Sequence, residues 1–142
     1  MSENMENRPA KLAHVGIEVS NIGRSREFYE ALARAIGLKT LYESQETIGW
    51  GNGEFNIWVI VSKDCRITRR PPEGNEAVVA DHTAIHLNRK EDVDAADRTM
   101  RKAGYPPLFS PEEHPEFTTG YYSAVYCDPD NYVIELFTVP RP

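Results

Sequence analysis

The chain has 142 residues, of which 40% are hydrophobic, and these values fit one globular domain with a core of ordinary size. Its formal net charge of −6 and its pI near 5.2 argue against a nucleic-acid or anionic-membrane surface, because such surfaces need a basic footprint. Residues 1–10 are polar and no segment is apolar enough for a signal peptide or membrane helix, so we expect a disordered tail and a cytoplasmic protein.

The first half of the chain predicts a strand, a helix and three further strands. Residues 12–19 alternate like a strand, which places His14, Gly16 and Glu18 on one face. Apolar residues at intervals of four then predict an amphipathic helix that ends at Gly37. Short runs typical of strands follow at 38–42, 46–50 and 55–61. We therefore expect a β-α-β-β-β module over residues 11–63.

The same pattern returns after a polar linker, which we place at residues 64–80. His82-Thr-Ala-Ile-His86-Leu repeats the first strand, and an amphipathic helix that ends at Gly104 repeats the first helix. A Pro-rich excursion over 106–120 precedes a closing hairpin that turns at Asp128-Pro-Asp-Asn131. Residues 81–139 therefore form a second module, and 11–139 form one α+β domain of two tandem β-α-β-β-β modules.

The closing strand carries a carboxylate among apolar residues. Glu135 lies between Ile134 and Leu136, and burial of an unpaired carboxylate costs several kcal/mol unless a cation or hydrogen-bond donor stands beside it. The repeat also places His14 and His82 at matching positions. Modules related by a pseudo-twofold axis would bring these three side chains together as a ligand set for Fe, Zn, Ni, Mn or Co. Exposed or structural histidines beside a solvated Glu135 are the alternative.

These motifs together resemble the vicinal oxygen chelate superfamily, which includes glyoxalase I, extradiol dioxygenases and the fosfomycin and bleomycin resistance proteins. The resemblance rests on the opening His14-Val-Gly-Ile-Glu-Val, on His82-Thr-Ala-Ile and on the closing Asp128-Pro-Asp-Asn-x-x-Ile-Glu135. It implies curved sheets around a metal-binding cup, a divalent ion that chelates neighbouring oxygens of a small substrate, and a homodimer. By that resemblance His14, His82 and Glu135 are the metal ligands.

The chain departs from this family at Trp58, which takes the place that Glu135 fills in the second module. Glyoxalase I-like members use a fourth metal ligand there, so we expect an open site beside an aromatic ring. Further residues are candidates from their position and chemistry. We expect the substrate cup to be lined by Trp58, Trp50, Tyr122 and Tyr126, and the catalytic candidates are Tyr122, His86 and Glu18. Core packing of the tyrosines and a structural polar pair of Glu18 with His86 remain open.

Two functions follow from this sequence. The first is a metal-dependent enzyme, either a glyoxalase-like lyase or an extradiol dioxygenase-like enzyme, that acts on a small molecule. The second is a metal-free protein that binds and sequesters a small molecule, such as a drug. The retained ligand set favours the enzyme, whereas Trp58 and the absence of an unambiguous base favour the binding protein.

Overall fold

The computed structural model describes residues 10–64, 66–72 and 81–140. Most of the predicted tail and about half of the predicted linker therefore lie outside the described residues. The first half contains β1 (His14–Val19), α1 (Ile22–Ile36), β2 (Lys39–Glu43), β3 (Thr47–Gly51) and β4 (Asn56–Val61). The second half contains β5 (His82–His86), α2 (Lys90–Lys102), β6 (Phe109–Glu113), β7 (Tyr122–Cys127) and β8 (Val133–Thr138). The predicted α+β fold of two β-α-β-β-β modules is confirmed.

Each module forms its own four-stranded sheet. The strand orders are β1-β4-β3-β2 and β5-β8-β7-β6, and in both sheets the first strand pairs in parallel with the last. Gly16 pairs with Trp58 in the first sheet, and Ala84 pairs with Glu135 in the second. Since Gly16 and Ala84 each follow the opening histidine by two residues, Trp58 and Glu135 occupy equivalent positions. The repeat thus extends to the register of the strands.

Local sequence signals explain where both helices begin. The Asn21 side chain accepts a hydrogen bond from the Arg24 N–H and caps α1. The cap of α2 is Arg89, and the Asp92 carboxylate accepts the Arg89 N–H. Part of the predicted Pro-rich excursion is also regular structure, because β6 lies within it and pairs with β7.

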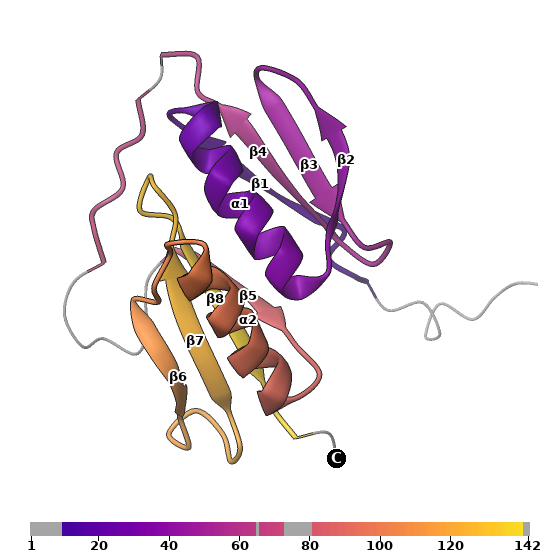
Figure 1. Cartoon of the computed structure of the whole chain (residues 1–142), viewed down its shortest axis with the longest axis vertical. Helices are drawn as coiled ribbons and strands as arrows, with labels where there is room; N and C mark the ends of the chain where they lie inside the picture. The colour runs from indigo at the N-terminus through magenta and orange to yellow at the C-terminus, as the bar shows by residue number, and fades with distance from the viewer. Residues whose placement is uncertain (1–9, 65, 73–80, 141–142) are drawn as a thin grey trace, which may run out of the picture.

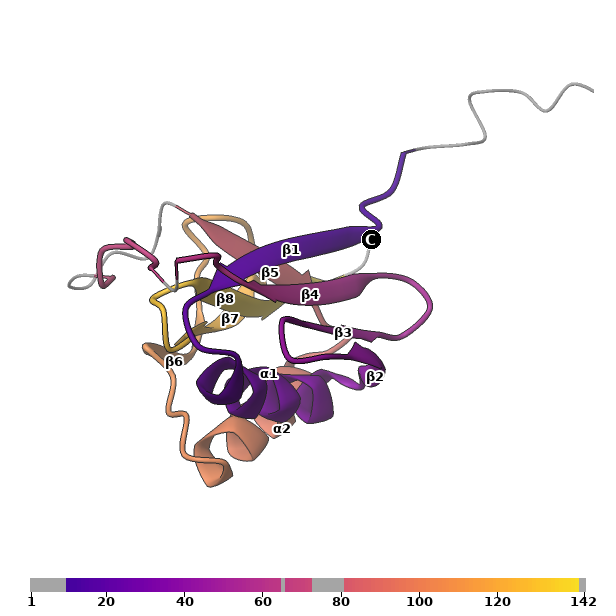
Figure 2. The ribbon, with the colours of Figure 1, turned by 90° about the horizontal axis from the view of Figure 1, so that it is seen from above.

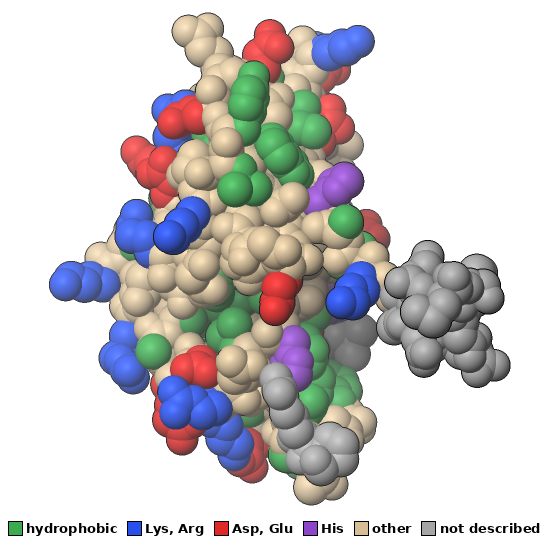
Figure 3. All heavy atoms as spheres, turned by 90° about the vertical axis from the view of Figure 1, so that its right-hand side faces the viewer, with side chains coloured by type: hydrophobic (Ala, Val, Ile, Leu, Met, Phe, Trp, Pro, Cys, Tyr) green, Lys and Arg blue, Asp and Glu red, His purple; other side chains and the backbone are tan. Residues whose placement is uncertain are grey.

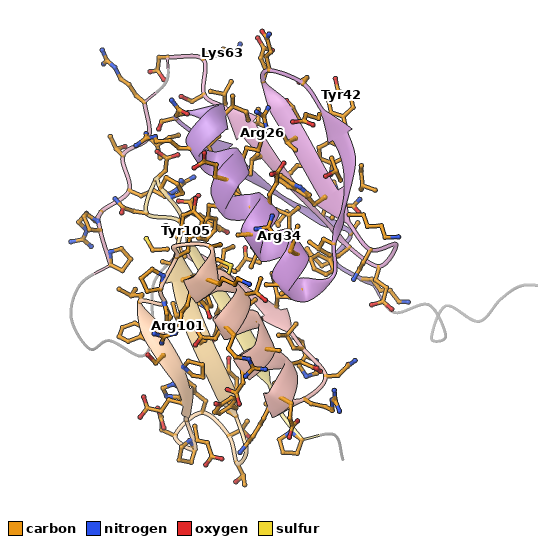
Figure 4. The ribbon with its side chains drawn as sticks, viewed as in Figure 1. Arg26, Arg34, Tyr42, Lys63, Arg101 and Tyr105 are labelled. Carbon is orange, nitrogen blue, oxygen red and sulfur yellow. The ribbon has the colours of Figure 1, made fainter. Side chains whose placement is uncertain are left out.

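The helices cover one face of each sheet and pack against each other where the modules meet (Figure 1; Figure 2). Phe28 of α1 contacts Tyr105 edge to face, with ring centroids 5.2 Å apart, and Tyr105 is labelled at this junction in Figure 4. The core lies between helices and sheets, while no helix of the described residues covers the opposite face of either sheet. No helix among the described residues is long and apolar enough to cross a membrane.

The β7–β8 turn fastens the second module to the first. The Tyr29 hydroxyl donates to Asp128 Oδ2 at 2.7 Å, and the Ser20 backbone N–H donates to Asp130 Oδ2 at 2.9 Å. Asn131 has the left-handed φ of 66° that the turn requires. These contacts place the C-terminal end of β1 beside this turn, so His14 lies at the far end of β1.

Candidate functional site

The helix-free face of the first sheet is hollowed beside His14. β1 and β4 supply the lining of a hollow of about 460 Å³, which consists of His14, Gly16, Asn56, Trp58 and Ile60. His14 and Gly16 are exposed, and Trp58 is half-buried. Strand alternation causes this arrangement, because Ile17, Val19, Ile57 and Val59 point into the core from the same two strands.

Trp58 leans away from β1 and leaves this hollow open. A Cβ atom built on Gly49, which pairs with Trp58 across β3 and β4, would lie 2.5 Å from the indole ring. The indole therefore lies directly over Gly49, with its centroid 6.2 Å from that of Tyr42. A Cβ on Gly16, the partner of Trp58 on the other side, would meet nothing within 4 Å. Trp58 is thus a wall of the hollow and Gly16 is its floor.

Apolar side chains continue from the hollow across the same sheet. Leu41, Tyr42 and Ile60 are exposed by 53%, 52% and 46%, which is unusual for large hydrophobic residues. A register shift in β2 between Thr40 and Tyr42 lets consecutive residues face the same side. Figure 3 shows hydrophobic side chains gathered on the first module. We call Leu41, Tyr42, Trp58 and Ile60 the apolar face.

The equivalent face of the second sheet carries the other predicted ligands. His82 Nε2 lies 3.6 Å from Glu135 Oε1, and the Glu135 side chain is only 10% exposed. The Tyr121 hydroxyl donates to the other oxygen, Glu135 Oε2, at 2.9 Å. Burial, together with the hydrogen bond to the Glu135 carboxylate and its charge, raises the pKa of Tyr121 well above that of an ordinary phenol. Tyr121 is therefore a neutral hydrogen-bond donor at physiological pH.

A row of aromatic side chains extends from Tyr121, the residue that binds this carboxylate. Phe137 stacks on His86 on one side and on Tyr121 on the other, with centroids 5.1 Å apart in both pairs. Phe117 meets Tyr121 edge to face at 5.3 Å and stacks on His114 at 5.4 Å. These residues come from β5, β8 and the β6–β7 connection. Tyr121 is thus held by a stacked ring and by an edge-to-face ring, and Phe137 links it to a predicted catalytic candidate, His86.

Three aromatic residues expected in the substrate cup face the helices instead. The Trp50 ring is buried and stacks on Tyr29 of α1 at 6.0 Å. The Tyr126 hydroxyl donates to Asp97 of α2, and the Tyr122 hydroxyl donates to Asp94 of the same helix. The prediction that Trp50, Tyr122 and Tyr126 line the cup is therefore wrong for this chain. The physical reason is register. Val125 lies opposite Glu135, so odd-numbered residues of β7 share the face of Glu135, whereas Tyr122 and Tyr126 face α2. Trp50 of β3 pairs with Ile57, whose side chain is buried in the core.

The other catalytic candidates remain on the helix-free faces. Glu18 and His86 are exposed, near the C-terminal ends of β1 and β5, and they are equivalent in the repeat. The Glu18 backbone oxygen accepts a hydrogen bond from Arg69. Each lies about 13 Å along its strand from the opening histidine, at about 3.3 Å per residue. Neither can bind the same ion as that histidine.

The three predicted ligands do not converge within one chain. Among the described residues, no three His, Cys, Asp or Glu side chains are close enough to hold a metal ion. His14 begins β1, about 20 Å from the Ser20 contact with the β7–β8 turn at about 3.3 Å per residue. His82 and Glu135 could bind the same divalent metal ion, because atoms 3.6 Å apart can both lie about 2.1 Å from one ion.

Comparison with known proteins gives consistent matches. A family model described as Glyoxalase/Bleomycin resistance protein/Dioxygenase superfamily matches residues 11–136. The uncharacterized protein YqjT of Bacillus subtilis (strain 168) is 27% identical over 125 residues, which cover 87% of this chain and 94% of YqjT. A putative glyoxalase from Bacillus halodurans superposes with a TM-score of 0.70 at 20% identity, covering 95% of this chain and 99% of that one. Lactoylglutathione lyase from Agrobacterium tumefaciens superposes with a TM-score of 0.64 at 15% identity, covering 92% and 95% of the chains.

Proposed function

The chain belongs to the Glyoxalase/Bleomycin resistance protein/Dioxygenase superfamily, and on that premise we propose that it is a metal-dependent enzyme acting on a small molecule with adjacent oxygens. His82 and Glu135 of one copy would hold the ion together with His14 of a second copy. The apolar face of the second copy would then form one wall of the site. The active protein in this proposal is a homodimer with two equivalent sites.

The equivalence of the two helix-free faces carries this proposal. His14 and His82 open the parallel strand pair of their modules, and both lie on the side away from the helices. Yet His14 lies at the end of β1 that is remote from the β7–β8 turn, beside which β8 and its partner His82 begin. A second copy can therefore supply the missing ligand without any change within the chain. It would also cover the apolar face, whose exposure needs a partner.

The residues that line the hollow favour small substrates that are apolar or aromatic apart from the oxygens that bind the ion. A bound divalent ion would supply a Lewis acid that polarises the substrate oxygens. The hollow beside His14 has Asn56 and Trp58 in its lining but no lysine or arginine to pair with an anionic group. Trp58 offers a ring on which an apolar or aromatic substrate can stack. Vicinal diols, α-hydroxy ketones and catechols have this chemistry.

A metal-free binding protein is the competing function. The exposed apolar face, which includes Leu41 and Tyr42, would suit the sequestration of a flat hydrophobic molecule. In such a protein His82 and Glu135 would be structural partners of each other and of Tyr121. Metal content separates the two functions.

Protein purified without an affinity tag or chelator should contain about one divalent ion per chain, as expected for one ligand set in each half of the dimer. His82→Ala and Glu135→Ala should each lose most of this metal, because few protein ligands remain. Elemental analysis of the folded variants measures this directly.

The matched control is His86→Ala. His86 lies on the same strand face as His82 but about 13 Å away, so its variant should retain the metal. Unchanged metal in both His82→Ala and Glu135→Ala would contradict the proposed site. A wild-type protein without metal that binds small aromatic molecules would instead favour the binding protein.

A further inference from the structure

The two carboxylate oxygens of Glu135 have different surroundings. Oε1 lies 3.6 Å from His82 Nε2, whereas Oε2 accepts the Tyr121 hydroxyl at 2.9 Å. Glu135 is 8% exposed, and its neighbours Ile134 and Leu136 are fully buried. The Tyr121 hydrogen bond satisfies Oε2, and breaking it would leave a buried oxygen without a donor. Oε1 is therefore the oxygen that can bind an ion. The available oxygen is the one beside His82.

Tyr121 is itself held rigidly in this position. Its ring is nearly parallel to that of Phe137, with an interplanar angle of 10°, and Phe117 packs against it edge to face. Its backbone C=O accepts the His114 N–H, and its own N–H donates to the Thr118 carbonyl. Because ring and backbone are both fixed, the hydroxyl cannot easily follow a carboxylate that rotates. The phenol therefore sets the rotamer of Glu135.

We infer that Tyr121 is a positioning residue of the proposed site, which holds Oε2 so that Glu135 binds the ion through Oε1 alone. This inference rests on the proposed function. A carboxylate that binds through one oxygen uses one coordination position, so further positions stay available for substrate oxygens. Tyr121 acts on the ion through Glu135 and does not touch it.

The adjacent residue provides a closely matched control. Tyr122 also donates its hydroxyl to a carboxylate, that of Asp94, at 2.5 Å. Asp94 belongs to α2, so this contact lies on the helix side of the same sheet. Tyr121→Phe and Tyr122→Phe thus each delete one hydroxyl and one hydrogen bond to a carboxylate, from neighbouring positions. Only the first deletion alters Glu135.

The test is the binding of Co²⁺ alone, which is measured by calorimetry and by visible absorption. We expect Tyr121→Phe to bind Co²⁺ about 10–100-fold more weakly than the wild type, the usual effect of removing the partner of a metal ligand. Its Co²⁺ spectrum should also change, because a carboxylate released from Tyr121 can bind through both oxygens. Tyr122→Phe should keep the wild-type affinity and spectrum even if it melts at a lower temperature.

The possible outcomes are distinct. Wild-type affinity and spectrum in Tyr121→Phe would overturn the inference while leaving the proposed function intact, and so would equal losses in both tyrosine variants. A wild type that binds no Co²⁺ would overturn the proposed function and this inference together. Should Tyr121→Phe not fold, Phe117→Ala removes a half-exposed ring that supports Tyr121. That variant should weaken Co²⁺ binding in the same direction, and an unchanged affinity would count against the inference.

Discussion

At the scale of single residues, two glycines decide the shape of the hollow. Gly49 gives Trp58 a flat surface to lie on, and Gly16 leaves the space beside His14 empty. Neither has the positive φ that would require glycine for backbone reasons. Their small size is therefore the property that matters. The sequence shows both glycines, but only the register reveals that they flank the same tryptophan.

Alanine at these two positions should have different effects. Gly49→Ala should destabilise the protein by about 1–3 kcal/mol, because its Cβ would force the indole from its place. Gly16→Ala should change stability by less than about 0.5 kcal/mol, since its Cβ meets nothing. It should nevertheless weaken catechol binding by filling the hollow. Urea unfolding and quenching of tryptophan fluorescence by catechol measure the two effects. Equal stability losses would contradict this account.

At the scale of elements, the β7–β8 turn depends on a buried carboxylate. Asp128 Oδ1 accepts the backbone N–H groups of Asp130 and Tyr132, and Oδ2 accepts the Tyr29 hydroxyl. One side chain therefore stabilises the turn and joins it to α1. Burial raises the pKa of Asp128 above its ordinary value of 3.8, although these hydrogen bonds oppose the shift. This turn was evident in the sequence, but its contact with the first module was not.

The stability of the fold should depend on pH through this group. Because the pKa of Asp128 is higher in the folded chain, the folded state binds the proton more tightly than the unfolded state. The contribution of Asp128 to the free energy of unfolding should therefore be greatest in acid and decline as the pH rises from 3.8 through the raised pKa. In Asp128→Asn this decline disappears. Urea unfolding of both proteins across acidic pH should show a changing difference in unfolding free energy, and a constant difference would refute the assignment.

Secondary structure and the repeat could be predicted because they depend on local periodicity, whereas parts of the site depend on register. Tyr121 and Tyr122 are adjacent, and alternation alone cannot tell which one faces Glu135. Pairing of Val125 with Glu135 decides it. Trp50 was misplaced although Ile48 alternates with it and glycines occupy 49 and 51. That alternation itself indicates that Trp50 points into the core, as the structure shows.

At the scale of the whole molecule, the relative placement of the modules decides whether a three-ligand site lies within one chain. No sequence pattern encodes the contacts of Tyr29 and Ser20 with the β7–β8 turn, which hold His14 away from His82. The apolar face, on the side of the first sheet away from α1, is also exposed. Both features support the proposed dimer. Sedimentation at micromolar concentration that detects only a 16.1 kDa species would contradict it.

Mixed dimers should test this arrangement most directly. His14→Ala and His82→Ala each remove one ligand from every site, so neither protein alone should bind metal well. When equal amounts are unfolded together and refolded, about half of the dimers should contain one chain of each kind. In such a dimer one site lacks both histidines, whereas the other combines the intact His14 and His82 from different chains. About a quarter of all sites should therefore regain wild-type metal affinity. A site built within a single chain would regain none, because every chain carries one defective ligand.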